Sequence, residues 1–485
     1  MLAASSEGVV LALDVGTSSC RASLYDVEAQ PAGDHVAQIT YAPHLTADGG
    51  AELDASALLD NLCAVVDQTQ RALRQPVLAV GASTFWHSLL GVDASGAPVT
   101  PLYLWLDGRA RGEMAALHDQ LDEREVHART GCVLHWTYWP ARLRWLRRTL
   151  PDVFKRVARW ISFGEFVQER LTGAKTVSRS MASGTGLLDV HTGEWYAPLL
   201  EFLDLEPEKL GSLAALNEGS TASRWPALKS VLWLPAVGDG ACSNIGAGCA
   251  SPEYFALMIG TSGAERAVWS PPADFSIPWG LWCYRVDEQR VVMGGALNDG
   301  GSLMDWLGHT LRFADVHQAE AEVGDIEPDS HGLTVLPLWG GERNPGWADD
   351  ARGAVVGLRL GTSPEMILRA CLEAVALRFA TIDGLLQQAL PSAGEVIATG
   401  GALLHSKTWM QIMADALGRP ILASAGAEAS SRGAAILALE AIGAAPANNQ
   451  PSTTERFDPV PDHTRRYRAA ADRQRRLYDA LVSND

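Results

Sequence analysis

The sequence predicts an α/β protein made of two domains of similar fold, and three observations lead to this prediction. First, a nine-residue stretch near the start recurs about half a chain later. Second, apolar runs of strand length alternate with longer segments whose apolar residues follow helical spacing. Third, 485 residues, 47% of them hydrophobic and 20% charged, suit large domains with ordinary cores. We place the two domains at residues 1–235 and 236–485.

The repeat consists of LALDVGTSS, residues 11–19, and FALMIGTSG, residues 255–263, which lies 244 positions later and shares five of nine residues. Each copy is an apolar strand that runs into a Gly-Thr-Ser turn. The backbone N–H groups and hydroxyls of such a turn suit phosphate oxygens. Two such turns facing each other across a cleft would hold a polyphosphate from both sides.

Asp14 precedes the first turn, whereas the second copy has Met258 at that place. A carboxylate beside a phosphate site is unfavourable unless a cation lies between them, and Mg²⁺ prefers such hard oxygen ligands. Asp14 is therefore a candidate magnesium ligand. The alternative is an acid that caps a turn at a strand end.

The remaining elements follow in order along the chain. We expect helices at 55–73, 364–390, 407–418 and 462–481, strands at 76–84 and 396–401, and a surface linker at 445–454. Gly418, followed by Pro420, ends the third of these helices.

Asp239 stands between Gly238 and Gly240, after the apolar stretch VLWLPAV. Flanking glycines leave a carboxylate exposed at a strand end, where the backbone can approach a ligand closely. Such an aspartate can accept the proton of a hydroxyl that becomes a nucleophile. The alternative is an ordinary turn aspartate.

Two segments carry residues that suit a polyol. STFWHSLLGVD, residues 83–93, contains Trp86 and His87, and LWLDGRA, residues 104–110, contains Trp105, Asp107 and Arg109. Aromatic rings cover C–H faces, and charged groups make paired hydrogen bonds to hydroxyls. A Trp-x-Asp-x-Arg string also occurs as a plain surface ion pair, and that alternative stays open.

Two glycine pairs precede expected helices. Gly400-Gly401, within ATGGALLHSKTW (398–409), would let an adenine or a ribose lie flat on the backbone, and Gly300-Gly301, within NDGGSLMDWL (298–307), could approach phosphate. A tight turn and a helix cap are the simpler explanations.

Composition excludes several classes of protein. With 39 Lys and Arg against 57 Asp and Glu, the net charge is −18, which disfavours nucleic acids and anionic membrane surfaces as partners. The seven cysteines stand singly without a CxxC pair, so we expect no disulfide framework and no structural zinc. Neither a signal peptide nor a transmembrane run is evident, and we expect a cytoplasmic location.

Taken together, the motifs resemble the FGGY family of carbohydrate kinases, nearly along the whole chain and in the family's order. The segments that carry this resemblance are DVGTSSCRA (14–22), LTGAKTVSRSMASGTGLLDVHTGEW (171–195), GDGACSNIGAG (238–248), IGTSG (259–263), LPLWGGERNPGWADDARGAVVGL (336–358) and TGGALLHSKTWMQIMADALGRPI (399–421).

The resemblance implies two ribonuclease-H-like, actin-like domains with ATP and Mg²⁺ in the cleft between them. By position it makes Asp239 the base that takes the proton of the sugar hydroxyl. It makes Asp14 and Asp239 the residues beside Mg²⁺. The ATP-binding positions are Thr17, Ser18, Arg21, Gly260, Thr261, Gly301, Gly400, Gly401 and His405. At the position of His405, relatives often have Asn or Ser. The sugar-site positions are Trp86, His87, Trp105, Asp107 and Arg109.

Within the family, the segments HSLLGVD, GDGACSNIGAG, IGTSGAER and GGALNDGG look most like the gluconate kinase branch. A gluconate site should supply a cation for the carboxylate, and Arg266 and Arg109 are the candidates. Trp86 departs from the branch, where methionine is usual, so a pentulose such as xylulose or another polyol stays open. So do a homodimer and two other functions: an actin-like nucleotide switch and an inactive sugar sensor.

Overall fold

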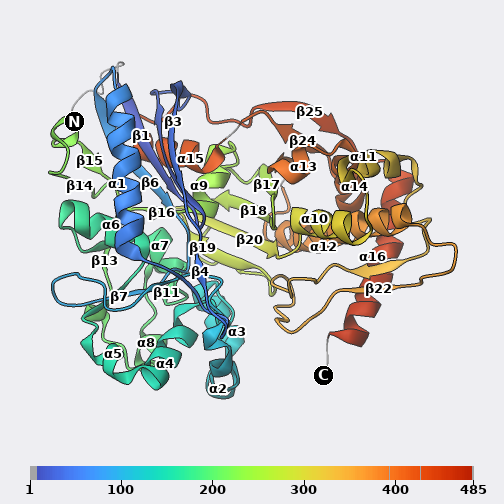
Figure 1. The fold of residues 1–485 in the computed structure, drawn as a ribbon, viewed down its shortest axis with the longest axis horizontal. Coiled ribbons are helices and arrows are strands. Elements are labelled where there is room, and N and C mark those ends of the chain that lie inside the picture. Colours follow the sequence, from blue (N-terminus) through green and yellow to red (C-terminus); the bar gives the residue numbers. More distant parts are fainter. Residues whose placement is uncertain (1–7, 393, 427, 483–485) are drawn as a thin grey trace.

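The first lobe is built on a mixed sheet of seven strands (Figure 1, blue to green). The structure is a computed structural model that describes residues 8–392, 394–426 and 428–482. The strands are β1 Val9–Val15, β2 Ser19–Tyr25, β3 Pro31–Thr40, β6 Val77–Thr84, β14 Ser220–Thr221, β15 Leu232–Trp233 and β16 Val237–Gly238. Their order is β14-β15-β6-β1-β2-β3, and β16 also pairs with β6.

The second lobe has its own seven-stranded sheet, in the order β19-β20-β18-β17-β23-β24-β25. Its strands are β17 Tyr254–Ile259, β18 Gly263–Trp269, β19 Trp282–Arg285, β20 Val291–Leu297, β23 Glu395–Thr399, β24 Ile421–Ser424 and β25 Thr453–Phe457. The expected boundary between residues 235 and 236 separates the two sheets except for β16, which joins the first. The domain limits themselves stay a prediction.

The repeated nine residues occupy equivalent places in the two sheets. β1 pairs antiparallel with β2 and parallel with β6, and β17 pairs antiparallel with β18 and parallel with β23. The neighbourhoods β3-β2-β1-β6 and β20-β18-β17-β23 therefore match strand for strand. The repeat predicted from the sequence is a structural repeat.

Two helices cross between the lobes. α9 (Asp239–Gly246) follows β16, and α15 (Ala429–Ala441) follows β24, yet α15 packs against α9 and against β1 and β6 of the first sheet. The crossing is close because both helices carry glycine there. A Cβ on Gly433 would lie 1.8 Å from the carbonyl oxygen of Cys242, and one on Gly246 would lie 1.8 Å from that of Ala429.

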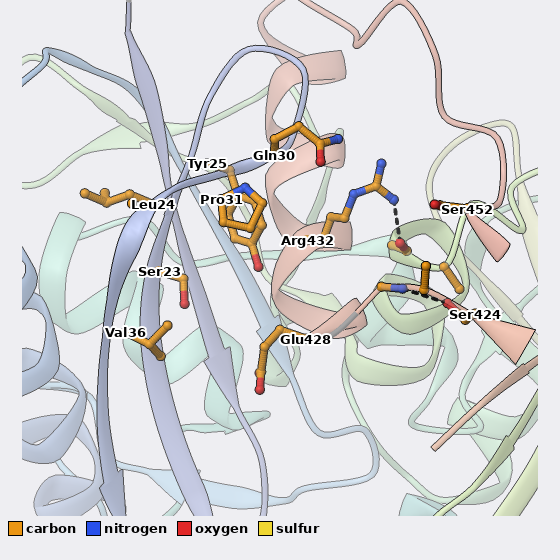
Figure 2. Close-up of a pocket in the computed structure, with 15 residues that line it drawn as sticks. Ser23, Leu24, Tyr25, Gln30, Pro31, Val36, Ser424, Glu428, Arg432 and Ser452 are labelled. Carbon is orange, nitrogen blue, oxygen red and sulfur yellow. Dashed lines mark hydrogen bonds between the residues drawn. The ribbon is translucent and has the colours of Figure 1, made fainter. Parts of the chain in front are cut away.

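Side-chain bonds reinforce this crossing. Arg432, on α15, donates from Nη1 to the carbonyl oxygen of Gly246 at the end of α9, at 2.6 Å (Figure 2). Its Nε donates to the carbonyl oxygen of Ala29, at 3.1 Å, in the turn between β2 and β3. One arginine thus joins three segments of the chain.

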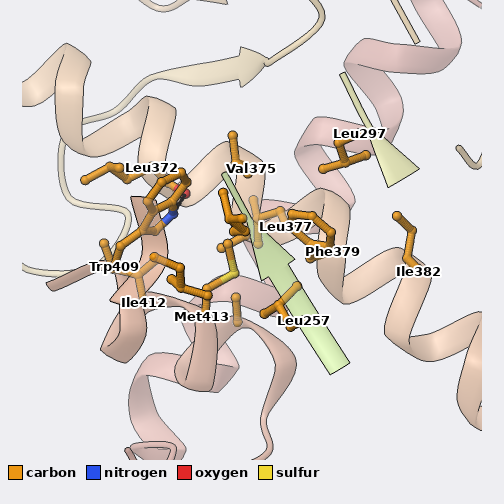
Figure 3. Packing of buried hydrophobic residues seen from close by; sticks show 14 of the residues in the cluster. Leu257, Leu297, Leu372, Val375, Leu377, Phe379, Ile382, Trp409, Ile412 and Met413 are labelled. Atoms are coloured by element: carbon orange, nitrogen blue, oxygen red, sulfur yellow. Dashed lines mark hydrogen bonds between the residues drawn. The ribbon is translucent and has the colours of Figure 1, made fainter. Parts of the chain in front are cut away.

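The second lobe has a core that is built mainly from the long helix α12 (Pro364–Ala389), α14 (Lys407–Leu417) and the sheet (Figure 3). Ser363 begins α12 by accepting from the N–H of Met366, with Pro364 in the first turn. Trp409 is buried and donates its indole N–H to the carbonyl oxygen of Leu372, at 3.2 Å. These helices and β23 confirm the segments expected at 364–390, 407–418 and 396–401.

In the first lobe, α1 (Ala55–Ala72) packs on β2 and β3, and it confirms the helix expected at 55–73. The carboxylate of Asp54 caps it by accepting from the N–H groups of Ser56 and Ala57. Leu58, Leu62, Val65 and Val66 form its buried face, at the spacing of one helical stripe.

The C-terminal helix α16 (Pro461–Leu481) confirms the segment expected at 462–481. It buries Tyr467, whose hydroxyl donates to Glu373 of α12 at 3.0 Å. Arg466 and Arg473 pair with Glu327 and Asp329. These ion pairs fit the expectation of a packing element.

Smaller elements complete the described chain. In the first lobe they are β4 His44–Leu45, β5 Ala51–Leu53, β7 Leu90–Val92, β8 Leu102–Tyr103, β9 Arg159–Ile161, β10 Thr176–Ser178, β11 Leu188–Asp189, β12 Glu194–Trp195, β13 Ser212–Ala214, α2 Met114–Gln120, α3 Glu123–Thr130, α4 Trp139–Thr149, α5 Pro151–Arg156, α6 Phe163–Thr172, α7 Arg179–Ser183 and α8 Ala197–Phe202. In the second they are α10 Gly301–Thr310, α11 Val316–Glu322, α13 Gly401–Leu404, β21 Thr334–Leu336 and β22 Ala354–Val356.

Two further observations concern the whole described chain. Among the described residues, none of the helices combines the length and the apolar character needed to cross a membrane. The seven cysteines are all free and buried, which agrees with the absence of a disulfide framework predicted from their spacing.

Candidate active site

A cavity of about 170 Å³ lies between the two lobes. The first lobe contributes Phe85, Trp86 and His87 from the end of β6, together with Trp105. The start of α9 contributes Asp239 and Gly240. The second lobe contributes Met258, Ser262, Gly263, Ala264, Arg266, Trp282, Tyr284, Ala296 and Arg343. The fold thus brings together Trp86, His87, Trp105, Asp239 and Arg266 of the residues singled out in the sequence.

Asp239 is the first residue of α9 and is partly buried. Burial raises the pKa of its carboxyl above the usual range, and Arg266 and Arg343 oppose that rise. The N–H of Gly240 donates to the carboxylate at 2.8 Å, which fixes one oxygen. The carboxylate is therefore a positioned proton acceptor on the cavity wall.

Glycine is required on both sides of Asp239 for a different reason from the one that the sequence suggested. A Cβ on Gly238 would lie 1.8 Å from the indole of Trp86, and one on Gly240 would lie 2.7 Å from the same ring. The indole N–H donates to the carbonyl oxygen of Ser180 at 3.0 Å, so the ring cannot move aside without losing that bond. The glycines make room for Trp86 rather than for an approaching ligand.

Two partly buried arginines line the cavity together with this single carboxylate. The Nη1 atom of Arg266 is buried without a hydrogen-bond partner among the described residues, and burial lowers the pKa of Arg266 to about 10. Arg343 lies over the ring of Trp105, 5.4 Å from its centre, and burial lowers its pKa too. Both stay protonated near neutral pH, so the cavity has an excess of positive charge.

Sequence reasoning did not single out Arg343. It lies in the LPLWGGERNPGWADDARGAVVGL segment that carried the family resemblance, directly before the cis bond between Asn344 and Pro345. Its membership of that segment was the only signal, because the other residues of the cavity lie 47 or more positions away in sequence.

Asp14 ends β1 next to the first turn, with Arg21 opposite on β2 and Ser83 opposite on β6. Burial raises the pKa of Asp14 to about 6, the neighbouring Ser83 hydroxyl opposes this, and the charge of Asp239 raises it further. The two carboxylates are therefore close enough to repel each other, which a shared divalent cation would relieve. Oxygen donors of this kind fit Mg²⁺.

In the first turn, the hydroxyl of Tyr41 donates to the carbonyl oxygen of Gly16 at 2.6 Å, and Tyr41 N–H donates to that of Ser18 at 2.9 Å. Ser18 is exposed and Thr17 is half-buried, so both are accessible from the cleft side. Arg21 forms an ion pair with Glu428, at the start of α15, at 2.5 Å. The first turn is thus tied to a residue 407 positions away.

The residues expected on the nucleotide side gather at one edge of the second sheet. The N–H of Gly301 donates to the carbonyl oxygen of Gly260 at 2.7 Å, and Ser302 donates to that of Thr261 at 3.1 Å. Gly400 has a φ of +86°, and a Cβ there would lie 2.4 Å from the carbonyl oxygen of Ile259. A Cβ on Gly401 would lie 3.7 Å from the ring of His405. Gly301 and Gly400 therefore adjoin the second turn, and Gly401 and His405 follow Gly400 as the first residue and the C-cap of α13.

The family models match two stretches of this chain. The N-terminal domain of the FGGY family of carbohydrate kinases matches residues 9–225, and the C-terminal domain matches residues 258–442. This chain belongs to the FGGY family of carbohydrate kinases.

Relatives cover nearly its whole length. Gluconokinase of Bacillus subtilis (strain 168) is 25% identical, over 95% of this chain and 93% of that protein. Glycerol kinase of Ralstonia nicotianae is 30% identical, over 90% of each. The structure of gluconate kinase from Lactobacillus acidophilus matches with a TM-score of 0.92, 25% identity and 99% of both chains. That of xylulose kinase from the same organism gives 0.91, 25% identity, and 98% of this chain and 99% of that one.

The fold is the two-domain, ribonuclease-H-like and actin-like fold of this family, as the resemblance predicted. FGGY kinases are phosphotransferases, so this chain is a carbohydrate kinase. The family also uses ATP as phosphoryl donor. The alternatives of a nucleotide switch and a passive sensor lose their support.

In this FGGY kinase, His87 has a left-handed backbone, with φ +64°, and its Nδ1 lies 2.6 Å from the carbonyl oxygen of Gly184. A carbonyl only accepts, so Nδ1 carries the proton. Burial lowers the pKa of His87 to about 3, which keeps the ring neutral at neutral pH. The Nε2 atom is then a hydrogen-bond acceptor for a substrate hydroxyl.

Asp107 and Arg109 do not line the cavity, in contrast to the sequence expectation. Arg109 donates to Asp107 and also to Glu52, each at 2.5 Å, and Asp107 accepts from the N–H of Ala51 at 3.1 Å. The guanidinium lies over the rings of Tyr103 and Trp145. The pair is a largely buried structural ion pair, which is the alternative that the sequence left open, although it is not on the surface.

Proposed function

We propose that this FGGY kinase transfers the γ-phosphoryl group of ATP to D-gluconate and forms 6-phosphogluconate, with Mg²⁺ as the metal. The observation that carries this proposal is the pair of partly buried arginines, Arg266 and Arg343, around the single carboxylate of Asp239. A neutral sugar would leave this excess positive charge uncompensated. A sugar acid supplies the missing negative charge.

The reaction follows from what each group can do. The carboxylate of Asp239 accepts the proton of the substrate hydroxyl, and the oxygen attacks the γ-phosphorus in line. The new O–P bond forms as the bond to the β,γ-bridging oxygen breaks, and ADP leaves with that oxygen. His87 accepts from another hydroxyl through Nε2, and the rings of Trp86, Trp105 and Tyr284 cover the carbon chain.

Asp14 and Asp239 would hold Mg²⁺, which neutralises charge on the phosphate oxygens when bound. On the phosphates, Thr17, Ser18 and Arg21 would act from the first turn, and Gly260 and Thr261 from the second. Gly301, Gly400, Gly401 and His405 would border the nucleoside. Their common edge on the second sheet supports this assignment.

A pentulose is the second candidate, because the structural match to a xylulose kinase is as close as that to a gluconate kinase. Glycerol is smaller than either and would fill less of the 170 Å³ cavity. The aromatic wall suits all three classes, so the choice between them depends on the two arginines.

The test is an ADP-release assay with D-gluconate, D-xylulose, L-ribulose, glycerol and a blank without sugar. We expect kcat/KM for D-gluconate to exceed the others by about tenfold or more, which corresponds to about 1.4 kcal/mol. A pentulose or glycerol at the top of the panel would refute the substrate and keep the kinase. Rates equal to the blank for every compound would refute the whole proposal.

A variant pair makes the substrate test sharper. Arg266→Met should lower kcat/KM for D-gluconate far more than for D-xylulose, because only the acid needs the cation. Arg266→Lys is the matched control, since it keeps the charge and should retain most of the preference. Equal losses on both sugars would show that Arg266 supports the second turn rather than the substrate.

A further inference from the structure

A second cavity, of about 320 Å³, lies between the lobes beside the start of α15 (Figure 2). Strands β2 and β3 and their turn supply one wall, with Ser23, Leu24, Tyr25, Gln30, Pro31, Gly33 and Val36. The other wall comes from Gly246, Ala247, Ser424, Ala425, Gly426, Glu428, Arg432 and Ser452. None of these residues lines the catalytic cavity or belongs to the expected nucleotide site.

One positively charged side chain of the cavity wall has no ionic partner among the described residues. The guanidinium of Arg432 donates to two backbone carbonyls, those of Ala29 and Gly246, and forms no ion pair with a described residue. Its Nη2 atom makes no hydrogen bond within the described chain. Because both bonds go to neutral acceptors, the full positive charge stays available to a bound oxyanion.

The acidic group of the wall, Glu428, is already neutralised. Its side chain is directed away from the Arg432 guanidinium (Figure 2), and Arg21 holds one oxygen of its carboxylate at 2.5 Å. The remaining polar groups are hydroxyls and an amide, from Ser23, Tyr25, Ser452 and Gln30, together with Ser424. The Ser424 oxygen accepts from Gly426 N–H at 3.2 Å, which leaves its hydrogen free to donate.

We propose that this cavity is a second ligand site, which binds a small hydroxylated oxyanion with its carboxylate or phosphate on Arg432. The hydroxyls and the amide would bind the hydroxyl groups of the ligand. The sugar acids and phosphorylated sugar acids of the proposed reaction have this chemistry, and so in part has free phosphate. For the identity of its ligand, the inference rests on the proposed function.

The site is connected to the catalytic cleft by the ion pair of Glu428 with Arg21. Arg21 lies opposite Asp14 on the neighbouring strand, beside the first phosphate turn. An anion in the cavity, which both Arg432 and Glu428 line, adds negative charge to this space and so holds Arg21 towards the second cavity. Arg21 is then less available to the nucleotide phosphates. The ligand therefore acts as an inhibitor that raises KM for MgATP.

Binding can be measured on the full-length enzyme by titration calorimetry with inorganic phosphate and with 6-phosphogluconate. The enzyme is first saturated with MgADP and D-gluconate, so that the catalytic cleft is filled. We expect 6-phosphogluconate to bind one further site per chain, about tenfold or more tighter than phosphate, because its hydroxyls add contacts. Loss of all binding after the preloading would show that the cavity belongs to the nucleotide site and would overturn the proposal.

Variants in and beside the cavity test where the ligand binds. Ser424→Trp fills the cavity and should weaken the second binding event about tenfold or more, whereas Thr453→Trp, on the strand residue opposite Ser424 and outside the cavity, should leave it within about twofold. Arg432→Gln should abolish the binding of both anions, and MgADP binding reports whether that variant is folded. Undiminished binding by a folded Ser424→Trp variant would refute the site.

The kinetic arm separates this inference from the proposed function. In the presence of 6-phosphogluconate, KM for MgATP should rise in the wild type and in Thr453→Trp but not in Ser424→Trp. If D-gluconate itself fails to bind the MgADP complex, the proposed substrate is wrong, and the Ser424→Trp comparison still decides on the second site with phosphate as probe. Identical inhibition of the wild type and Ser424→Trp would contradict the link through Glu428.

Discussion

Asp239 combines three properties that a general base of a phosphoryl transfer needs. It is partly buried, one of its oxygens is held by an N–H, and two arginines near it oppose the rise of its pKa. The N–H belongs to the flanking Gly240, whereas the burial and the two arginines depend on residues that the fold brings in from elsewhere in the chain.

Replacing Asp239 with Asn should therefore remove the reaction and spare the nucleotide. We expect kcat to fall by about 10²–10⁴-fold, the usual contribution of a positioned proton acceptor. Binding of ADP, measured by calorimetry without Mg²⁺, should stay close to the wild-type value. A variant that keeps near-normal turnover would take the role of base away from Asp239.

Arg142 acts on the same cavity from behind. It is 2% exposed, and from α4 it donates to the carbonyl oxygens of His87 at 2.6 Å, Leu104 at 2.5 Å and Trp136 at 3.3 Å. Two of these carbonyls belong to segments that line the sugar cavity. Arg142 is thus a positioning residue that holds His87 and the loop of Trp105 together.

Arg142→Gln should raise KM for the sugar several-fold and leave KM for ATP nearly unchanged, because none of the three carbonyls that Arg142 holds belongs to a residue expected to bind the nucleotide. It should also cost about 1–3 kcal/mol of stability for each carbonyl left without a donor. The matched control is Arg148→Gln on the same helix, whose side chain is 63% exposed and pairs with Glu113. Equal increases in both KM values would contradict a local role.

At the scale of elements, the crossing of α9 and α15 sets how close the lobes come. No residue other than glycine fits at Gly246 and Gly433, because backbone atoms of the partner helix occupy the place of a Cβ. Overpacking of this kind usually costs about 1–3 kcal/mol and occasionally more.

Gly433→Ala should therefore lower the free energy of unfolding by at least about 2 kcal/mol. Gly384→Ala, in the interior of α12 with open space around it, is the control and should be neutral or stabilising by up to about 1 kcal/mol. Chemical denaturation of both variants measures the difference. A Gly433→Ala variant as stable as Gly384→Ala would contradict the close crossing.

The start of α6 carries a pH-dependent element. Ser162 and Glu165 form a capping box, in which Ser162 N–H donates to the carboxylate of Glu165 at 2.6 Å. Burial raises the pKa of Glu165 from 4.5 to about 7, with the nearby charges of Glu169 raising it and Arg159 lowering it. The folded state therefore holds a proton that the unfolded state has lost between these two pH values.

The contribution of this proton to stability is complete below pH 4.5 and is lost as the pH rises through about 7. Between pH 5 and pH 8, the free energy of unfolding of the wild type relative to Glu165→Gln should thus fall by at most about 3 kcal/mol. The melting temperature of the wild type should fall accordingly relative to that of the variant. Glutamine keeps the acceptor but does not titrate. Parallel melting curves for the two proteins over this range would refute the raised pKa.

The sequence predicted the elements and the two-domain repeat because these depend on local periodicity and turn chemistry. It also placed Trp86, His87 and Trp105 in one segment pair that reaches the cavity. It could not predict that Asp107 and Arg109 turn away, since Glu52, the second partner of Arg109, comes from the distant strand β5. Nor could it predict the pairing of Arg21 with Glu428, which joins residues 407 positions apart.

At the scale of the whole molecule, the catalytic cavity belongs to neither lobe alone. Asp239, the second-lobe arginines and the aromatic wall of the first lobe meet only where the lobes face each other. Closure of the lobes around the substrate would exclude water, and water would otherwise take the phosphoryl group.

Closure can be observed directly. All native cysteines are buried, so cysteines introduced at Lys155 and Lys407, 78% and 77% exposed on opposite lobes, can be labelled selectively. We expect the distance between the labels to shorten with MgADP and D-gluconate together, more than with either alone. ATP hydrolysis without sugar should be weak and strongly stimulated by the substrate. An unchanged distance would contradict closure.

The position of α15 also has a consequence for how the protein is made. Residues 429–441 supply Ala434, Ile436 and Ala438 to the cluster that covers Val10 and Ala79 of the first sheet. During synthesis, β1 and β6 leave the ribosome long before that cover exists, although domains usually fold in the order of synthesis. The first lobe must therefore wait, with an apolar face uncovered, for nearly the last part of the chain. A nascent chain halted before Ala429 is a substrate for holding chaperones rather than a folded half of the enzyme.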